Sequence, residues 1–357
     1  MAGYGFVQVG RLGGNLVMTR LLVPEMFGVM AIATMVTVIL ALLSDIGLRT
    51  HIVQSRRGDD PLFLDTAWVV QIFRGFALWL AALGISMALH LANAEGMLPA
   101  KSVYASPELP LAIAISSFSA VISGFQSTKW ATASRHFDQK RIMQIELIAQ
   151  LVALAVMVVI ALASRSIWAL IAGGLVGWLT TTVLSHTWMK GYQNRFRWEK
   201  NALNELIDFG KWIFLSSVLS VLAGNGDLLL LGAFVEADVM GLYAIAILIV
   251  GAIGGGLGRL FAAVFLPALS AVVRDDPSQL RDVYYKLRVP FDLLLLFLAG
   301  LLFADGKIFV DLLYDSRYSG AGDMLRILAL SFFAIRYQVA KQVYLAVGMP
   351  QYLVAIH

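Results

Sequence analysis

Long apolar stretches separated by short polar segments dominate the chain. A helix that crosses a lipid bilayer needs about 20 apolar residues, with a range of roughly 17–25. Stretches of this kind without a charged residue occur at 26–44, 75–94, 109–128, 147–164, 166–189 and 239–258. Strands of a membrane barrel alternate apolar and polar residues and would not produce such stretches. Each stretch therefore predicts one membrane-spanning helix.

Four further stretches are apolar but contain embedded charges. They are 3–22 with Arg11, 209–232 with Lys211 and Asp227, 285–304 with Asp292, and 324–345 with Arg326, Arg336 and Lys341. Prolines such as Pro24, Pro61 and Pro277 fall beside the intervening loops, where they do not interrupt helical hydrogen bonding. The pattern therefore predicts an all-α, polytopic membrane protein with about ten transmembrane helices.

Composition supports this class and excludes others. Hydrophobic residues make up 59% of the 357 residues and charged residues 14%, whereas soluble domains have about 45–50% and about 25%. The absence of cysteine excludes a disulfide scaffold and thiolate metal sites. The five histidines show no metal-ligand spacing, so we expect no metal, no cofactor and no enzyme activity. The net charge of +4 lies in short loops, which argues against nucleic acid.

The loops differ in charge according to their position. Basic residues such as Arg56, Arg135, Arg195 and Arg281 gather in the loops after the second, fourth, sixth and eighth expected helices. The loops between them carry few. Because loops rich in Lys and Arg stay on the cytoplasmic side, the amino terminus is expected in the cytoplasm.

An internal similarity suggests two repeated lobes. The segment Gly28-Val-Met-Ala-Ile-Ala33 opens the second expected helix, and Gly241-Leu-Tyr-Ala-Ile-Ala246 opens the eighth. Six helices separate the copies, so both would have the same orientation, as in transporters built from parallel repeats. Chance similarity of Gly, Ala and Ile is the alternative. The expected lobes are 1–190 with six helices and 191–357 with four, which predicts that two or more helices are missing from the carboxyl end.

Several ordered motifs resemble those of bacterial polysaccharide biosynthesis proteins. They are Arg20-Leu-Leu-Val-Pro-Glu-Met-Phe-Gly28, Ser44-Asp-Ile-Gly-Leu48, Asp227-Leu-Leu-Leu-Leu-Gly232, Gly241-Leu-Tyr243, Phe265-Leu-Pro-Ala-Leu-Ser270 and Leu325-Arg-Ile-Leu-Ala329. The chain thus resembles oligosaccharide-lipid flippases, the polysaccharide transporter family within the multidrug/oligosaccharidyl-lipid/polysaccharide flippase superfamily. The order and spacing of the motifs carry the resemblance, because each motif alone is weak.

The resemblance implies two helical lobes around a central cavity in the bacterial cytoplasmic (inner) membrane. Such a protein moves an undecaprenyl-diphosphate-linked repeat unit from the cytoplasmic to the periplasmic leaflet by alternating access. The repeat unit serves the assembly of lipopolysaccharide O-antigen, capsule or exopolysaccharide. The implied partners are the lipid-linked oligosaccharide, membrane lipids, a coupling ion (H+ or Na+) and the polysaccharide polymerase machinery, with no nucleic acid.

A cavity that accepts a diphosphate needs cations, and arginine binds phosphate through two parallel hydrogen bonds. An intramembrane charge costs roughly 2.5–3.5 kcal/mol, so each one suggests a function. The candidate substrate-binding residues are Arg11, Asn15, Arg74, Arg259 and Arg336. The resemblance implies cavity arginines on the first and eighth helices, where Arg11 and Arg259 lie. For Arg74 and Arg259 the alternative is that the side chain reaches the phosphates at the membrane surface.

Acidic residues supply a second set of candidates. Asp227 and Asp292 could couple transport to H+ or Na+, because a desolvated carboxylate exchanges protons near neutral pH. The structural alternatives are an ion pair with arginine or a contact at a helix end. Asp59-Asp60 and Asp275-Asp276 precede Pro61 and Pro277 and are expected to be turn or capping residues.

Two other functions remain open. A multidrug/cation antiporter of the same superfamily would need an acidic, aromatic cavity, whereas the deep charges here are mostly arginines. An integral-membrane polysaccharide polymerase or glycosyltransferase would normally show a large extracytoplasmic loop or a soluble domain. The sequence therefore favours the flippase.

Overall fold

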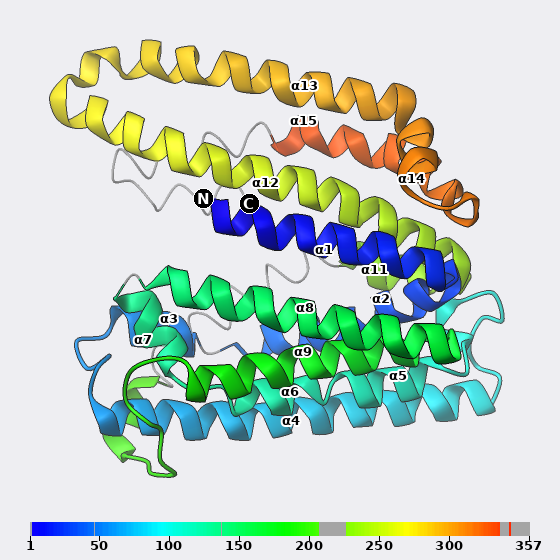
Figure 1. Ribbon diagram of the computed structural model, residues 1–357, viewed down its shortest axis with the longest axis horizontal. Helices are drawn as coiled ribbons and strands as arrows, with labels where there is room; N and C mark the ends of the chain where they lie inside the picture. Colours follow the sequence, from blue (N-terminus) through cyan, green and yellow to red (C-terminus); the bar gives the residue numbers. More distant parts are fainter. Residues whose placement is uncertain (1, 46, 137, 207–225, 336–342, 344–357) are drawn as a thin grey trace. The chain divides into compact units, whose positions relative to one another are not determined.

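A computed structural model describes residues 2–45, 47–136, 138–206, 226–335 and 343, and in these ranges the regular structure is entirely helical (Figure 1). Six of the described helices are long and apolar enough to cross a membrane, and a seventh span results if one bent pair is counted as one. The expected all-α, polytopic class is therefore confirmed. Of the other expected spans, 3–22 coincides with a described helix, Ala2–Leu21, that is not among these six or seven. The expected spans 209–232 and 324–345 lie largely or partly outside the described residues.

The first two helices form a hairpin. Helix α1 runs from Ala2 to Leu21 and α2 from Pro24 to Leu43. Pro24 stands at the first position of α2, where its missing N–H group costs no hydrogen bond. The helices therefore match the expected stretches 3–22 and 26–44 to within about two residues, the usual uncertainty of helix ends.

Helix α4 is longer than the stretch that predicts it. After the short α3 (Leu48–Gln54), α4 runs from Pro61 to Ala94. The Asp60 side chain accepts a hydrogen bond from Leu62 N at 3.0 Å, which caps the helix as expected. A helix of 34 residues is about 51 Å long and exceeds the roughly 30 Å hydrocarbon core. Its ends therefore extend into the headgroup regions.

The expected span 109–128 is broken into short helices. The described elements are η1 (Val103–Ala105), α5 (Leu109–Ser116), α6 (Ser119–Gly124) and α7 (Lys129–Arg135). The axis bends by 64° between the pair α5–α6 and α7. Helices α8 (Gln139–Ser164) and α9 (Trp168–Thr187) follow, each at an expected stretch.

Small residues bring the helices of this part close together. A methyl group added at Gly75 of α4 would lie 2.5 Å from the carbonyl oxygen of Ala120, and one at Gly173 of α9 would lie 2.8 Å from that of Ala153. Such positions let membrane helices approach through their backbones. Gly75 and Gly173 are therefore packing residues.

The chain divides into two compact units, Met1–Gly241 and Leu242–His357. The first also contains α11 (Gly226–Gly232) and the first turn of α12 (Ala237–Asp275). The second contains the rest of α12 followed by η2 (Pro277–Gln279), α13 (Leu280–Leu313), η3 (Ser316–Tyr318), α14 (Gly320–Leu328), η4 (Ala329–Ser331) and α15 (Phe332–Ile335). Compact units and sequence repeats are different properties, so the expected lobes 1–190 and 191–357 stay a prediction.

The first turns of α2 and α12 pack against each other through corresponding residues. A methyl group at Gly28 would overlap the carbonyl oxygen of Ala237, and one at Gly241 would overlap that of Pro24. Gly28 and Gly241 open the two similar sequence segments, and Pro24 and Ala237 each lie four residues before them. The contact is therefore reciprocal, as expected if the two segments are copies of one ancestral hairpin.

Candidate functional site

Helix α1 combines close packing with exposed charge. A methyl group at Gly10 would lie 3.1 Å from the Gln150 Nε2 atom of α8, and one at Gly14 would lie 3.3 Å from Leu154 Cδ1. This Gly-x-x-x-Gly spacing places both glycines on one side of the helix. Arg11 follows Gly10 and lies about 100° around the helix from it, so its side chain leaves α1 to one side of the α1–α8 contact.

Arg11 and Asn15 lie one above the other on α1, because residues four apart share a helix face. Arg11 is exposed, and Asn15 is partly buried. Within the described ranges, no acidic side chain forms an ion pair with Arg11. We name Arg11 and Asn15, together with Gln150 of α8, whose amide faces Gly10, the α1 polar face. It offers a guanidinium and two amides, groups that bind phosphate and sugar hydroxyl oxygens.

Arg74 has structural partners in the first unit. Its Nη2 atom donates to the carbonyl oxygen of Ala41 at 2.6 Å, and its Nε atom donates to Ser44 Oγ at 3.0 Å. Ser44 is the C-cap of α2, where carbonyl groups lack helical partners and the helix dipole favours a cation. Arg74 thus satisfies the end of α2, a role that neither the cavity nor the snorkelling interpretation anticipated.

The two candidate coupling carboxylates occupy different settings. Asp227 is exposed in the first turn of α11, where the helix N-terminus stabilises a negative charge. Asp292 of α13 accepts a hydrogen bond from Arg288 Nε at 3.2 Å, and Arg288 also donates to the Tyr284 hydroxyl at 2.8 Å. Asp292 therefore forms an ion pair within its own helix. Ion coupling by either residue stays a prediction.

The other candidates are Arg259 and Arg336. Arg259 belongs to α12, and Arg336 lies outside the described residues. Arg11, Asn15, Arg74 and Asp227 lie in the first unit, whereas Arg259 and Asp292 lie in the second. Within the first unit, α1 carries both Arg11 and Asn15. Arg74 belongs to α4, and its side chain contacts the end of α2.

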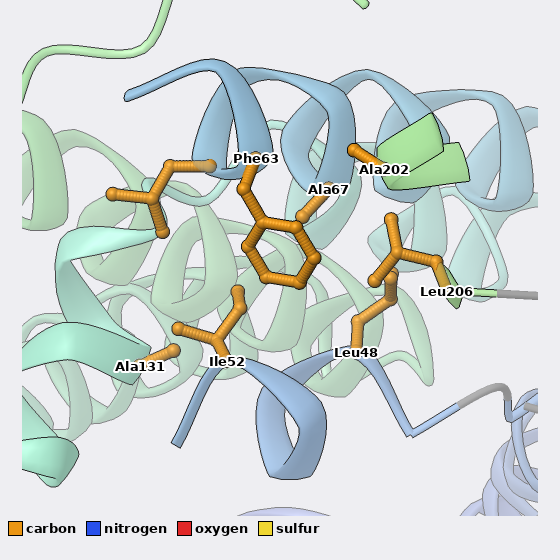
Figure 2. Packing of buried hydrophobic residues seen from close by; sticks show 8 residues of the cluster. Leu48, Ile52, Phe63, Ala67, Ala131, Ala202 and Leu206 are labelled. Atoms are coloured by element: carbon orange, nitrogen blue, oxygen red, sulfur yellow. The ribbon is translucent and has the colours of Figure 1, made fainter. Parts of the chain in front are cut away.

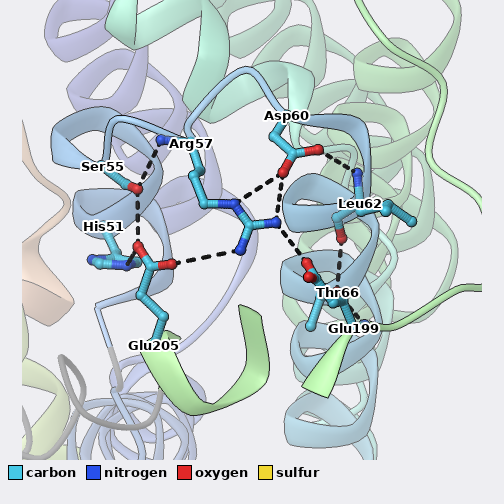
Figure 3. A network of polar contacts seen from close by, with 8 residues as sticks. All are labelled: His51, Ser55, Arg57, Asp60, Leu62, Thr66, Glu199 and Glu205. Carbon is cyan, nitrogen blue, oxygen red and sulfur yellow. Dashed lines mark hydrogen bonds and ion pairs between the residues drawn. The ribbon is translucent and has the colours of Figure 1, made fainter. Parts of the chain in front are cut away.

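A charged cluster ties the segment before α4 to residues 199–205 (Figure 3). Arg57 Nη2 contacts Asp60 at 2.6 Å and Glu199 at 2.5 Å, and Arg57 Nη1 lies 3.8 Å from Glu205. The Glu205 Oε1 atom also lies 3.2 Å from His51 Nε2 and accepts from Ser55 Oγ at 3.1 Å. Arg57 thus joins three carboxylates. Its hydrogen bonds to Glu199 and Asp60 raise its pKa, and the hydrogen bond from Arg57 lowers the pKa of Asp60.

A second polar group holds residues 192–199 against the start of α4. Asp65 is fully buried, and its two oxygens accept from Arg195 N at 2.7 Å and from the Tyr192 hydroxyl at 2.9 Å. Glu199 N donates to Thr66 Oγ1 at 2.9 Å. Buried carboxylates persist only when their oxygens accept hydrogen bonds. This arrangement therefore fixes the backbone on both sides of residues 196–198.

Apolar packing completes the attachment (Figure 2). Leu48 and Ile52 of α3 meet Phe63 and Ala67 of α4, and the cluster also includes Leu64, Ala131, Ala202 and Leu206. Burying a large apolar side chain contributes roughly 1.5–3 kcal/mol. The helical residues 200–206 are therefore held by both apolar burial and ion pairs.

These polar residues were difficult to recognise from the sequence. Asp65 stands alone in an apolar helix, and its partners lie more than a hundred residues later in the chain. Gln150 looks like one uncharged polar residue in a long apolar stretch. In contrast, Asp60 and Asp276 cap the segments that begin at Pro61 and Pro277, as expected. A cap can be predicted because its partner is two residues away.

Comparisons with known proteins agree with this architecture. A family model described as polysaccharide biosynthesis protein matches residues 17–344. A structure of the lipid II flippase MurJ in an inward closed conformation matches with a TM-score of 0.65 and 12% identity, covering 99% of this chain and 77% of that chain. A crystal structure of MATE in complex with MaD3S matches more loosely, with a TM-score of 0.47 and 14% identity over 98% and 83%. No curated protein sequence gives a significant match.

Proposed function

Because the chain belongs to the polysaccharide biosynthesis protein family and shares the fold of the lipid II flippase MurJ, we propose that it is a lipid-linked oligosaccharide flippase. Its substrate is an undecaprenyl-diphosphate-linked oligosaccharide, the repeat unit of O-antigen, capsule or exopolysaccharide. The protein moves this substrate from the cytoplasmic to the periplasmic leaflet of the bacterial inner membrane by alternating access.

The α1 polar face is the observation that carries this proposal. A diphosphate cannot cross the roughly 30 Å hydrocarbon core without groups that replace its hydration. Exposed Arg11 supplies a permanent positive charge on α1, which the sequence predicts to span the membrane. Asn15 on the same helix face and Gln150 on the adjacent α8 supply neutral hydrogen-bonding groups. A charge in this position costs roughly 2.5–3.5 kcal/mol. An anionic substrate offsets that cost.

The sign of these groups favours a flippase over a multidrug/cation antiporter. A guanidinium repels a cationic drug, whereas it attracts a diphosphate through charge-assisted hydrogen bonds. The three residues of the α1 polar face include no carboxylate. Asp227 and Asp292, which lie elsewhere, stay our candidates for coupling to H+ or Na+. Arg259 and Arg336 stay candidates for the substrate path in the second lobe.

The reciprocal contact of Gly28 and Gly241 supports the two-lobe organisation that alternating access requires. Residues related by the proposed repeat meet at the starts of α2 and α12, as in transporters built from parallel repeats. We therefore retain lobes 1–190 and 191–357 as part of the proposal, with the amino terminus in the cytoplasm. The polysaccharide polymerase machinery would receive the translocated unit.

Complementation tests this function. The chain is expressed in bacterial strains that lack their own O-antigen, capsule or exopolysaccharide flippase, and surface polysaccharide is measured by gel ladder and by antibody binding. Restored polysaccharide in at least one strain is expected. If the protein inserts well and restores none, reconstituted vesicles loaded with fluorescent undecaprenyl diphosphate and with a cationic dye separate the two candidates. Transport of the dye alone would support the antiporter.

A further inference from the structure

Residues 195–198 form an exposed patch in which cations alternate with aromatic rings. The sequence there is Arg195-Phe196-Arg197-Trp198, and all four residues are exposed. Phe196 is 64% exposed and Trp198 is 68% exposed. Large aromatic residues with this exposure in a soluble loop would be costly, because burying one contributes roughly 1.5–3 kcal/mol. At a membrane surface they are favourable.

The patch is held rigidly from behind. Arg195 N donates to the buried Asp65, and Glu199 N donates to Thr66. Between them, Arg197 N donates to the carbonyl oxygen of Arg195 at 2.8 Å, which makes a tight turn centred on Phe196. The backbone is thus fixed before any ligand binds, so binding costs little additional conformational entropy.

Aromatic contacts place the patch beside the lipid-facing side of α4. The Phe196 ring lies 6.2 Å from the Trp68 ring and 6.4 Å from the Phe73 ring, both edge to face. Phe73 is 55% exposed on this membrane-spanning helix. Trp68 lies seven residues into α4, about 10 Å from its start. A helix of about 51 Å that crosses a core of about 30 Å leaves about 10 Å outside the core at each end. Trp68 therefore lies close to the boundary between headgroups and acyl chains.

The charges of the patch are available for a ligand. Within the described residues, no carboxylate forms an ion pair with Arg195 or Arg197. The nearest acid in sequence, Glu199, pairs with Arg57. Exposed Lys190 and Lys200 flank the patch and add to its positive potential. Cations and aromatic rings together match a lipid that carries a negative headgroup above an acyl chain.

We propose that residues 195–198 bind anionic phospholipid headgroups and anchor this segment at the membrane surface. Arg195 and Arg197 contact the headgroup phosphate, and Phe196 and Trp198 enter the boundary between headgroups and acyl chains. The site lies on the segment that Asp65 and Arg57 fasten to the first unit. Lipid binding there is independent of the transported substrate, so it can be tested whether or not the chain proves to be a flippase.

The absence of cysteine makes a local probe straightforward. Gln193→Cys, at an exposed position, is labelled with an environment-sensitive fluorophore in the full chain reconstituted in phosphatidylcholine nanodiscs. Equal fractions of spin-labelled phosphatidylglycerol or spin-labelled phosphatidylcholine are then compared as quenchers. Greater quenching by phosphatidylglycerol is expected. Equal quenching by the two lipids would overturn the proposal.

Variants assign the effect to the patch. Arg195→Gln/Arg197→Gln is expected to weaken the preference for phosphatidylglycerol by about fivefold per cation, while Arg195→Lys/Arg197→Lys retains most of it. Arg56→Gln/Lys140→Gln removes the same charge from two other exposed positions and is expected to leave the preference intact. If this control pair weakens it equally, the effect is general charge and the assignment is wrong.

Two further experiments test whether the aromatic rings enter the membrane and whether the ligand is a lipid. Phe196→Ala/Trp198→Ala is expected to reduce quenching by acyl-chain labels, and unchanged quenching would contradict membrane insertion. Inorganic phosphate at constant ionic strength is expected not to displace the phosphatidylglycerol. Complete displacement would show that the site takes a soluble anion rather than a lipid. Each variant is first checked for a single peak in size-exclusion chromatography.

Discussion

The charged cluster around Arg57 and the α1 polar face use charge in opposite ways. Arg57 contacts three carboxylates, and nearby Asp65 accepts two hydrogen bonds while fully buried. Arg11 is exposed on α1, which the sequence predicts to be a membrane helix, and it forms no ion pair with an acidic side chain of the described residues. Satisfied charges stabilise a fold, whereas an exposed charge in a membrane helix demands a ligand or water. The difference separates residues that hold the protein together from residues that we propose to serve transport.

The largest effect on stability is expected where the backbones of α2 and α12 touch. In Gly241→Val the new side chain would overlap the carbonyl oxygen of Pro24, and steric damage of this kind exceeds about 4 kcal/mol. We expect loss of folded protein, measured by fluorescence-detected size-exclusion chromatography. Gly255→Val in the same helix is the control, because nothing lies within 4 Å of the added methyl group there. Equal loss in both variants would mean that the close contact is unimportant.

The next largest effect on stability is expected from removing the Asp65 carboxylate. Asp65→Ala leaves the Tyr192 hydroxyl and the Arg195 N–H without their acceptor in a buried place, which is expected to cost about 2–4 kcal/mol. Thermal unfolding in detergent should show a lower Tm, and limited proteolysis should cleave residues 190–206 faster. Asp138→Ala removes a carboxylate that is 45% exposed, and surface pairs contribute about 0–1 kcal/mol. Proteolysis at the wild-type rate in Asp65→Ala would contradict the attachment described above.

Substituting Arg74 tests whether this arginine stabilises the fold, like Arg57, or serves transport, as we propose for Arg11. Its two hydrogen bonds cap α2, so Arg74→Ala is expected to destabilise the protein by about 1.5–3 kcal/mol. Complementation, corrected for the amount of folded protein, should remain near the wild-type level. A normal Tm combined with lost complementation would instead place Arg74 in the substrate path.

The smallest effect is a pH dependence of the charged cluster. Arg57 lowers the pKa of Asp60 in the folded protein, so this pair stabilises the fold fully above the unfolded pKa of about 4. That contribution is lost as the pH falls through the folded pKa. The Tm of wild type should therefore fall between about pH 5 and pH 3. The Asp60→Asn variant, whose Tm is lower at neutral pH, should show a smaller decrease in Tm over the same pH range. An identical decrease in both proteins would show that Asp60 is not responsible for the pH dependence.

The membrane helices could be predicted because their signal is local. Twenty apolar residues in a row predict a span whatever the rest of the chain does, and Asp60-Pro61 and Asp276-Pro277 mark helix starts through bonds to residues two positions away. The bend between α6 and α7 was not predicted, because residues 109–128 contain no charged residue and were therefore expected to form one span.

Side-chain roles were harder to predict because their partners are distant in the sequence. Arg74 was identified as a charge that needs a partner, but the carbonyl group of Ala41 that accepts from it lies 33 residues earlier. Asp65, Glu199 and Glu205 acquire their partners only when residues 192–206 fold back onto α3 and α4. Arg11 stays a prediction, made because a charge within an apolar stretch is conspicuous in the sequence alone.

Binding by Arg11 tests the central claim most directly. Undecaprenyl diphosphate is titrated onto purified wild type, Arg11→Gln and Arg56→Gln, and the bound fraction is measured by native mass spectrometry. The account predicts that Arg11→Gln binds at least about tenfold more weakly, because a charge-assisted hydrogen bond contributes about 1.5–3 kcal/mol, with an unchanged Tm. Arg56→Gln should bind like wild type. Wild-type binding by folded Arg11→Gln would contradict the assignment of the α1 polar face as the substrate site.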